Sequence, residues 1–265
     1  MLVAFETMHC IDRRRKGKEA LMALKLNMSK AYDRIEWGYL EAMMRRLGFH
    51  DRWIALMMMC VTLVTYSVLI NGEPKGKIIP SRELRQGDPI SPYLFLLCAE
   101  GLTAMLKKEE AIGNIKGVAV CRGAPRISHL LFADDSIVFF RSSLDEASRV
   151  MKVLEDYEGD LGQRLNKEKT SLFFSKNTSR EVQDQVKGLF GAQIIRHHEK
   201  YLGLPPLVGK GKRKAFSRIK DMVGRKILGW KGKLLSNAWR EILIKAVAQA
   251  MSTYTMSCFK LPDLL

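Results

Sequence analysis

Apolar and polar positions alternate in short blocks along the first 175 residues, and the blocks switch between the periods of helices and strands. Short apolar runs rich in β-branched or aromatic residues are typical of strands, while residues after Ser143 place apolar side chains at helical spacing. The pattern predicts helices near 35–47, 53–64, 91–108 and 144–161, a hairpin at 66–80, two strands within 127–140, and a strand at 170–174.

Boundary signals accompany several of these elements. Gly48 is expected to end the first helix, and Asn71-Gly72 is a turn signal within the hairpin. The loop RQGDPISP, residues 85–92, leads into a helix for which Ser91 is the expected cap. Ser143-x-x-Glu146 is the pattern of a capping box at the start of the helix that follows.

The last quarter of the chain has a different pattern. Gly and Pro residues interrupt residues 201–211, and two basic amphipathic helices are expected near 212–228 and 237–259. Mixed strands and helices followed by an all-helical segment indicate an α+β fold, with a small antiparallel sheet packed by helices. We place the domain boundary near 204–212, where Pro205-Pro206 breaks the pattern.

The charge balance points to a polyanionic partner. The chain has 265 residues, 47% of them hydrophobic, so it can bury a real core, and its formal net charge is +16. Residues 196–265 contain 15 Lys and Arg against 4 Asp and Glu, which places +11 of the +16 in that segment. Solvated helix faces explain part of this excess but not its one-sided sign. Nucleic acid is therefore the expected partner, ahead of an anionic membrane surface.

Cysteine usage and hydropathy argue against a secreted disulfide-bonded protein and against a membrane protein. The five cysteines are scattered and form no Cys-x-x-Cys pair, which argues for reduced thiols in an intracellular protein. The first ten residues have too short an apolar run for a signal peptide. Residues 53–70 carry no charge, but they contain polar residues and end at a turn. We interpret them as a helix and a strand, not as a membrane span.

Residues 130–140 read LLFADDSIVFF, so Asp134 and Asp135 stand side by side within an apolar stretch. Asp is common in tight turns, and a plain hairpin turn is one interpretation. Carboxylates flanked by apolar strands are poorly solvated, however, and such groups commonly hold Mg²⁺. Two ions about 4 Å apart can activate a hydroxyl and stabilise the leaving oxygens of a phosphoryl transfer. In a basic chain this favours polymerase, nuclease or nucleotidyltransferase chemistry.

A metal site of this kind needs an oxygen ligand from a second element, and the segment KLNMSKAYDRIEW, residues 25–37, is the candidate. Five blocks follow one another along the chain: LKLNMSKAYDRIEW, LRQGDPISPYLF, LLFADDSIVFF, LNKEKTSLFFS and YLGLPPLVGK. Together they resemble the palm of reverse transcriptases from non-LTR (LINE-type) retrotransposons, most closely those of plants. The resemblance covers nearly the whole chain, from about Leu2 to Leu265.

The resemblance implies roles for the residues of the metal site and its substrate. Asp134 matches the direct ligand of two expected ions, Mg²⁺ or Mn²⁺, and Asp135 matches a second aspartate whose role is closer to support. Tyr32 matches the aromatic residue that lies under the sugar and rejects a 2′-hydroxyl, so dNTPs are the expected substrate. Packing in the core would explain Tyr32 equally well.

The loop RQGDP and a downstream lysine complete the implied substrate site. Arg85 and Gln86 offer donors to template and nucleotide, and Gly87 lets the backbone approach a base or sugar closely. Lys167 or Lys169 falls where the family has a lysine near the leaving phosphates; we take Lys169 as the candidate, although the residues do not decide between them. An ordinary loop and solvated lysines are the simpler interpretations.

The resemblance also divides the chain and implies its partners. Residues 1–24 match a remnant of the fingers, 25–207 the palm, and 208–265 a truncated, thumb-like helical region. The turn YLGLPP resembles the primer-grip hairpin. The basic helices would hold an RNA template and a DNA primer by their phosphates, so binding should be sensitive to salt. No membrane partner is expected, and the family implies access to the nucleus.

Two departures from the family are visible. The main metal-binding aspartate lies five residues before Tyr32 in the family, and here that position is Asn27. Asn27 keeps an oxygen that can contact a cation but lacks the negative charge, and Asp33 matches a different aspartate. The fingers blocks before Lys25 are absent or reduced to a stub, and endonuclease, RNase H and zinc-knuckle regions are not found. We therefore expect an excised or decayed piece of a polyprotein.

Three functions account for these features to different degrees. The first is an RNA-directed DNA polymerase that adds dNTPs to a primer 3′-hydroxyl. The second is a catalytically inactive relic that only binds nucleic acid, which Asn27 favours. The third is another basic two-metal enzyme such as a nuclease, which does not explain Tyr32, RQGDP and YLGLPP together.

Overall fold

The computed structural model describes residues 2–17, 19–132, 135–195, 212–231 and 236–260. The chain forms two compact units, one of residues 10–196 and one of residues 1–9 with 197–265. Helix α1 (Leu2–Arg13) crosses the boundary between them. The predicted division into fingers remnant, palm and thumb-like region stays a prediction, although its boundary after residue 24 falls inside a strand.

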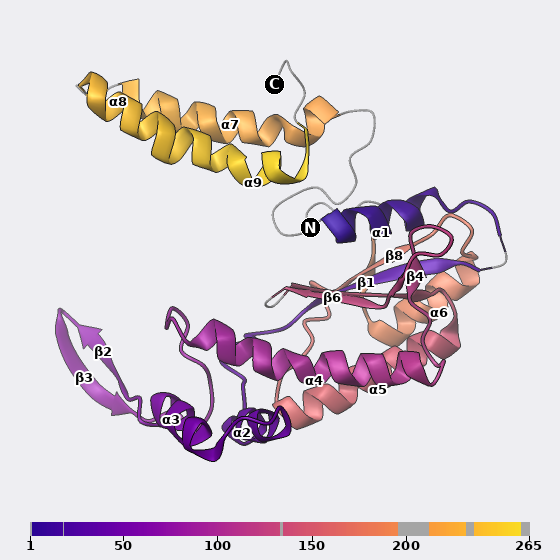
Figure 1. The fold of residues 1–265 in the computed structure, drawn as a ribbon, viewed down its shortest axis with the longest axis horizontal. Helices are drawn as coiled ribbons and strands as arrows, with labels where there is room; N and C mark the ends of the chain where they lie inside the picture. The colour runs from indigo at the N-terminus through magenta and orange to yellow at the C-terminus, as the bar shows by residue number, and fades with distance from the viewer. Residues whose placement is uncertain (1, 18, 133–134, 196–211, 232–235, 261–265) are drawn as a thin grey trace. The chain divides into compact units, whose positions relative to one another are not determined.

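A five-stranded sheet forms the centre of the unit of residues 10–196 (Figure 1). Its order is β6-β7-β1-β8-β9, and all neighbours pair antiparallel except β8 and β9, which are parallel. The strands are β1 (Leu21–Asn27), β6 (His129–Phe132), β7 (Asp135–Arg141), β8 (Ser171–Phe174) and β9 (Gln193–Ile194). The α+β prediction is confirmed, but the parallel strand β9 was not predicted, because two residues leave no readable alternation.

One face of this sheet supports the main core. Alternate residues of β1 (Met22, Leu24 and Leu26) are fully buried and join one apolar cluster with helices α4 (Ser91–Ala111) and α5 (Leu144–Leu161). Figure 1 shows these two long helices lying side by side along the sheet. The alternation of side chains along a strand sends the other half of β1, including Lys25 and Asn27, to the opposite face.

Shorter elements surround this core. They are α2 (Trp37–Arg46), α3 (Asp51–Thr62), α6 (Arg180–Phe190), and two hairpins, β2 (Tyr66–Ile70) with β3 (Glu73–Ile78) and β4 (Val118–Ala119) with β5 (Arg126–Ile127). The predicted helices near 35–47 and 53–64 are therefore present with slightly shifted ends. Residues 53–70 form most of α3 and then β2, and no helix in the described ranges is long and apolar enough to cross a membrane.

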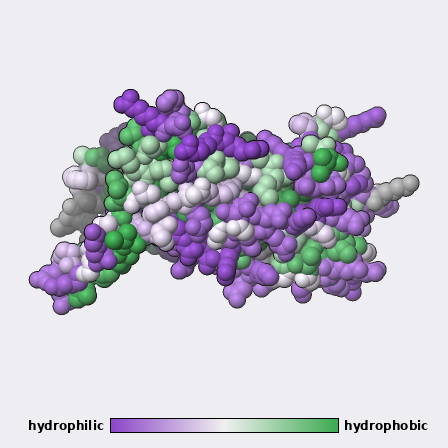
Figure 2. Space-filling view, turned by 90° about the horizontal axis from the view of Figure 1, so that it is seen from below, coloured by the Kyte–Doolittle hydropathy of each residue, from purple (hydrophilic) through white to green (hydrophobic). Residues whose placement is uncertain are grey.

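The β2–β3 hairpin is a separate two-stranded sheet. Its turn residues Asn71 and Gly72 both have positive φ, of 53° and 84°, as the Asn-Gly turn signal predicts. Five of its large apolar side chains, or those directly after it, are more than half exposed: Val68, Leu69, Ile70, Ile78 and Ile79. In Figure 2, hydrophobic residues gather beside the part that projects at the lower left, the side on which Figure 1 places this hairpin.

The two predicted helix caps turned out differently. Ser91 is not the cap of α4; Ile90 precedes the helix, its N–H donates to the Asp88 carboxylate (2.9 Å), and Ser91 is the buried first helical residue. The Ser143 hydroxyl accepts from the Glu146 N–H (3.4 Å), as predicted for α5. The capping box is only half formed, however, because the Glu146 carboxylate binds elsewhere.

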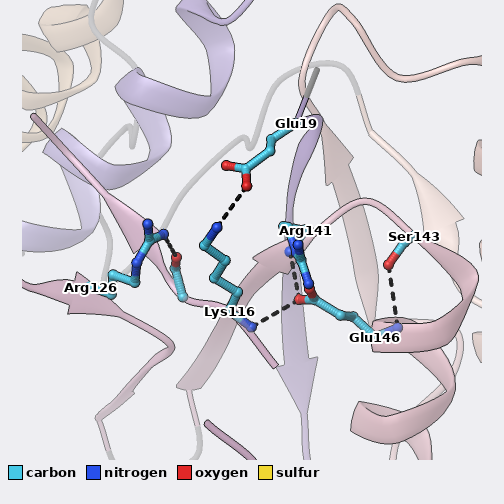
Figure 3. A network of polar contacts seen from close by, with 7 residues as sticks. Glu19, Lys116, Arg126, Arg141, Ser143 and Glu146 are labelled. Atoms are coloured by element: carbon cyan, nitrogen blue, oxygen red, sulfur yellow. Dashed lines mark hydrogen bonds and ion pairs between the residues drawn. The ribbon is translucent and has the colours of Figure 1, made fainter. Parts of the chain in front are cut away.

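Glu146 anchors the end of the sheet where β1 begins and β7 ends. Its side chain is only 3% exposed, and its carboxylate accepts hydrogen bonds from the N–H groups of Lys116 and Arg141 (3.0 Å each). It also pairs with the Arg141 guanidinium, while the Lys116 ammonium lies 2.7 Å from the Glu19 carboxylate (Figure 3). A buried charge is thus surrounded by donors from β7 and from the segment before β4.

The second unit contains the C-terminal helices, of which the first carries most of the basic residues. They are α7 (Lys212–Lys231), α8 (Asn237–Leu243), the π-helix η1 (Ile244–Gln249) and α9 (Ala250–Cys258). Both predicted helices are present, and the second is interrupted by the π-helix. Phe259 contacts the rings of Phe5 and Phe216, with centroids 5.0 Å and 5.6 Å away. The predicted turn at 201–207 and the domain boundary near 204–212 fall mainly among residues outside the described ranges.

Candidate active site

Asn27 and Asp135 lie directly opposite each other at one end of the central strand pair. Asn27 is the last residue of β1, Asp135 is the first of β7, and they are paired in the antiparallel register. Directly paired residues of antiparallel strands extend on the same face of the sheet. The structure therefore brings together these two of the predicted metal-site residues. Asp134, the third, lies outside the described residues.

Lys25 is a member of this site that the sequence analysis missed. Its ammonium lies 3.6 Å from the Asp135 carboxylate, and the two side chains are 21% and 29% exposed. Lys25 precedes Asn27 by two residues, so both side chains lie on the same face of β1. The period of two along the strand was the signal that could have found it.

The turn before β8 is bound to the end of β1. The Asn166 N–H donates to the Asn27 carbonyl (2.8 Å), and the Ser29 N–H donates to the Arg164 carbonyl (2.8 Å). Lys167 and Lys169 follow in this turn with exposed side chains. The backbone thus holds the predicted lysine segment beside Asn27, while no contact of either ammonium within the described ranges favours one lysine over the other.

Tyr32 is held by ring stacking and by hydrogen bonds to the backbone of its loop. Its ring stacks on Phe95 of α4, with centroids 4.8 Å apart and planes inclined by 16°. The buried Gln163, which is only 1% exposed, donates a side-chain hydrogen bond to the carbonyl of Ala31, the residue before Tyr32. Tyr32 itself is half-buried and packs against the main core.

The RQGDP loop is attached to the same segment. The Leu84 N–H donates to the Tyr32 carbonyl (2.9 Å), and the Glu83 N–H donates to the Ile35 carbonyl (2.9 Å). Arg85, Gln86 and Gly87 follow in exposed positions. Gly87 has a φ of +90°, which other residues rarely adopt, so this turn needs a glycine. Their predicted contacts with template and nucleotide stay predictions.

A small pocket borders this loop and is lined by residues that include Trp37, Tyr66, Arg85 and Asp88. Burial, together with a hydrogen bond to Glu83, raises the pKa of Tyr66. The Tyr66 hydroxyl therefore keeps its proton at neutral pH, and that proton is shared with the Glu83 carboxylate.

The described residues supply only a part of the site for the pair of divalent ions that the resemblance implies, because Asp134, the predicted direct ligand, lies outside them. At the end of β1 and β7 they offer one carboxylate (Asp135) and one amide oxygen (Asn27), with the Lys25 ammonium beside the carboxylate. Within the described ranges no three His, Cys, Asp or Glu residues form a group that could hold a metal ion. Mg²⁺ sites in proteins rely on carboxylates, and a neighbouring ammonium repels a cation.

Comparison with known sequences identifies relatives of the chain. A sequence model of the family described as reverse transcriptase (RNA-dependent DNA polymerase) matches residues 1–205. An uncharacterised mitochondrial protein of Arabidopsis thaliana is 53% identical over 68 residues, which are 26% of this chain and 56% of that protein. A retrovirus-related Pol polyprotein from the type-1 retrotransposable element R2 of Popillia japonica is 27% identical over 161 residues, 61% of this chain.

The chain spans only a part of these relatives, about a quarter (25%) of the Popillia japonica polyprotein. Among solved structures, apo telomerase from Candida tropicalis, truncated from its C-terminal domain, aligns with 67% of this chain and 35% of that one. The TM-score is 0.48 and the sequence identity is 18%.

Proposed function

The chain belongs to the reverse transcriptase (RNA-dependent DNA polymerase) family, and from this premise we propose that it binds an RNA template with a DNA primer but adds dNTPs only weakly. The family and the retrotransposon relatives support the polymerase class. The weakness of the chemical step is inferred from the residues at the end of β1 and β7.

One observation carries this proposal: Asn27, not an aspartate, lies directly opposite Asp135. An amide in place of a carboxylate removes a full negative charge from the point where the family needs it. A loss of about 3 to 5 kcal/mol of transition-state stabilisation slows a reaction roughly a hundred- to several-thousand-fold. The fold of the site remains, because Asn27 keeps its strand pairing and its bond to Asn166.

Binding of nucleic acid is supported by the basic helices. Five Lys and Arg residues of α7, α8 and η1 have exposed side chains: Lys220, Arg225, Lys226, Arg240 and Lys245. Basic side chains that neutralise phosphates release counterions, so affinity should fall steeply with salt and depend little on sequence. Such binding does not require Asn27 and would persist when extension is slow.

Selection of the sugar is assigned to Tyr32. Its ring is stacked on Phe95 and its loop is fixed by hydrogen bonds to Leu84 and Gln163. A side chain held in this way cannot easily move aside for a larger substrate. We propose that Tyr32 excludes a 2′-hydroxyl by contact, so that dNTPs are preferred over ribonucleotides.

Primer extension on an RNA template, with Mg²⁺ or Mn²⁺, tests the proposal. The variant Asn27→Asp restores the missing charge, and Asn71→Asp introduces the same change in the exposed β2–β3 turn as a matched control. We expect Asn27→Asp to extend the primer strongly, while the parent chain and Asn71→Asp extend it weakly. Equal extension by the parent chain and Asn27→Asp would refute the proposal, and salt-dependent binding without extension by any variant would support a binding-only role.

A further inference from the structure

Three hydrogen bonds bind Glu83 and Leu84 to the segment that carries Tyr32. The Glu83 N–H donates to the Ile35 carbonyl (2.9 Å), and the Glu83 carbonyl accepts from the indole Nε1 of Trp37 (2.8 Å). The Leu84 N–H donates to the Tyr32 carbonyl (2.9 Å). The backbone that leads into the RQGDP loop is therefore attached directly to the segment of the proposed sugar-selecting residue.

Glu83 has a backbone conformation that residues with a side chain rarely adopt. Its φ is +99°, in a region that favours glycine. The two other non-glycine residues with positive φ in the described ranges, Lys30 and Asn71, have values of 52° and 53°, which lie in the ordinary left-handed region. A strained conformation persists only where the surrounding contacts fix it. For Glu83 these contacts lie on both sides of the residue, at its N–H and at its carbonyl.

Trp37 supplies one of these contacts from a fixed position. It is the first residue of α2, and its ring is partly buried against the main core. The indole N–H can only donate, and it donates to Glu83. Trp37 and Glu83 also line the small pocket that reaches Arg85, the first residue of the exposed loop.

We propose that Trp37 is a positioning residue, which holds the strained Glu83 carbonyl and thereby fixes the RQGDP loop relative to Tyr32. The inference rests on the proposed function in taking Tyr32 and Gln86 as residues that contact the incoming dNTP. Without the indole N–H, Glu83 relaxes towards a negative φ, which redirects the chain as it enters the loop. The loop then occupies several conformations, and the dNTP binds more weakly because fewer molecules hold the productive one.

Hydrogen exchange of the free chain tests the local part of this proposal. Trp37→Phe keeps an aromatic ring but lacks the N–H, and Trp53→Phe makes the same change at a ring that stacks on Phe49. We expect the Leu84 N–H to exchange about three- to tenfold faster in Trp37→Phe, which is the factor that one hydrogen bond supplies. Exchange at Leu84 should not change in Trp53→Phe.

The role of backbone strain is tested by removing it. Glycine adopts a φ of +99° without a steric penalty, so in a Glu83→Gly background Trp37→Phe should accelerate exchange at Leu84 by less than about twofold. Glu83→Ala lacks the carboxylate but keeps the strain, so its Leu84 N–H should exchange faster than that of Glu83→Gly. This second comparison does not depend on whether Trp37→Phe folds.

Addition of a single dNTP to a template–primer complex, in the Asn27→Asp background, separates positioning from a general loss of structure. Trp37→Phe should raise the dNTP concentration for half-maximal rate about three- to tenfold and leave the maximal rate within about twofold. Trp53→Phe should change neither value, and Glu83→Gly should largely restore the dNTP concentration that Trp37→Phe requires.

Unchanged exchange at Leu84 in Trp37→Phe, or an equal acceleration with and without Glu83→Gly, would overturn the proposal. A lower maximal rate with an unchanged dNTP requirement would also overturn it. Lack of extension by Asn27→Asp would count against the proposed function instead. The exchange measurements need neither primer nor metal, so they would still decide whether Trp37 fixes the loop.

Discussion

Each end of the β1–β7 strand pair has a carboxylate, but the two carboxylates differ in burial and in the number of donors that contact them. At the end where Leu21 pairs with Arg141, Glu146 is nearly inaccessible and binds two backbone N–H groups and a guanidinium. At the other end, where Asn27 pairs with Asp135, the carboxylate is 29% exposed and its ammonium partner lies 3.6 Å away.

This difference separates a structural carboxylate from one that is available for chemistry. Glu146 has its accepting positions used by donors of the chain itself, so it stabilises the fold and binds nothing else. Asp135 is held more loosely and faces a position where the family has a second acid. We infer that the Glu146 end fixes the strand pair, which allows the carboxylate at the Asn27 end to remain more exposed.

The largest effect on stability is expected at the Glu146 end. Glu146→Gln removes a buried charge from the Arg141 guanidinium and one acceptor from the surrounding N–H groups. Breaking a buried pair in this way costs about 3 kcal/mol of unfolding free energy. Urea denaturation measures it, with Glu41→Gln as control, because Glu41 forms an exposed pair with Arg45 and should matter by less than about 0.5 kcal/mol.

A loss of stability for Glu146→Gln no larger than that for Glu41→Gln would contradict the structural role of this end. It would mean that solvent compensates Glu146 despite its burial.

A smaller effect is expected at the Asn27 end. Asp135→Asn removes the ion pair with Lys25 but keeps the size of the side chain and the strand register. The pair is partly exposed and not in close contact, so we expect a change within about 1 kcal/mol in the same denaturation experiment. A loss equal to that of Glu146→Gln would show that both ends are structural, and the comparison would fail.

The smallest effect is expected from His129, which lies on β6 between the two ends and contacts the Ser128 hydroxyl. Burial, aided by the Lys107 ammonium, lowers the pKa of His129. The folded state therefore favours the neutral ring. This contribution is fully present above the ordinary His pKa of about 6.5 and is lost as the pH falls towards the folded pKa.

Unfolding free energies at about pH 7.5 and about pH 5.5 test this expectation. The parent chain should lose more stability over this interval than His129→Gln, which does not titrate. Identical pH dependence of the two proteins would show that the ring is not held neutral by the fold.

The sequence was sufficient for those parts of the site that lie in long, regular patterns. The apolar runs around Asp135 predicted its strands, and the five blocks predicted that Asn27 and Asp135 belong to one site, but the strand β1 that ends at Asn27 was not predicted. The register that places them opposite each other, however, depends on pairing between residues more than 100 positions apart, which local periodicity does not encode.

Other features could not be predicted because they depend on contacts and not on pattern. Glu146 looked like half of a capping box, yet its carboxylate accepts from the N–H groups of Lys116 and Arg141. Ser91 looked like a cap, but Asp88 provides the acceptor one turn earlier. Lys25 lies in an apolar run of the sequence, and its ion pair with Asp135 could be recognised only from the structure.

The rate of a single nucleotide addition to a preformed template–primer complex tests the central claim most directly, because excess protein removes differences in binding. The account predicts that Asn27→Asp adds the nucleotide at least about a hundredfold faster than the parent chain, while Asn71→Asp does not differ from it. Equal rates for Asn27→Asp and the parent chain would contradict the claim that Asn27 limits catalysis at the site opposite Asp135.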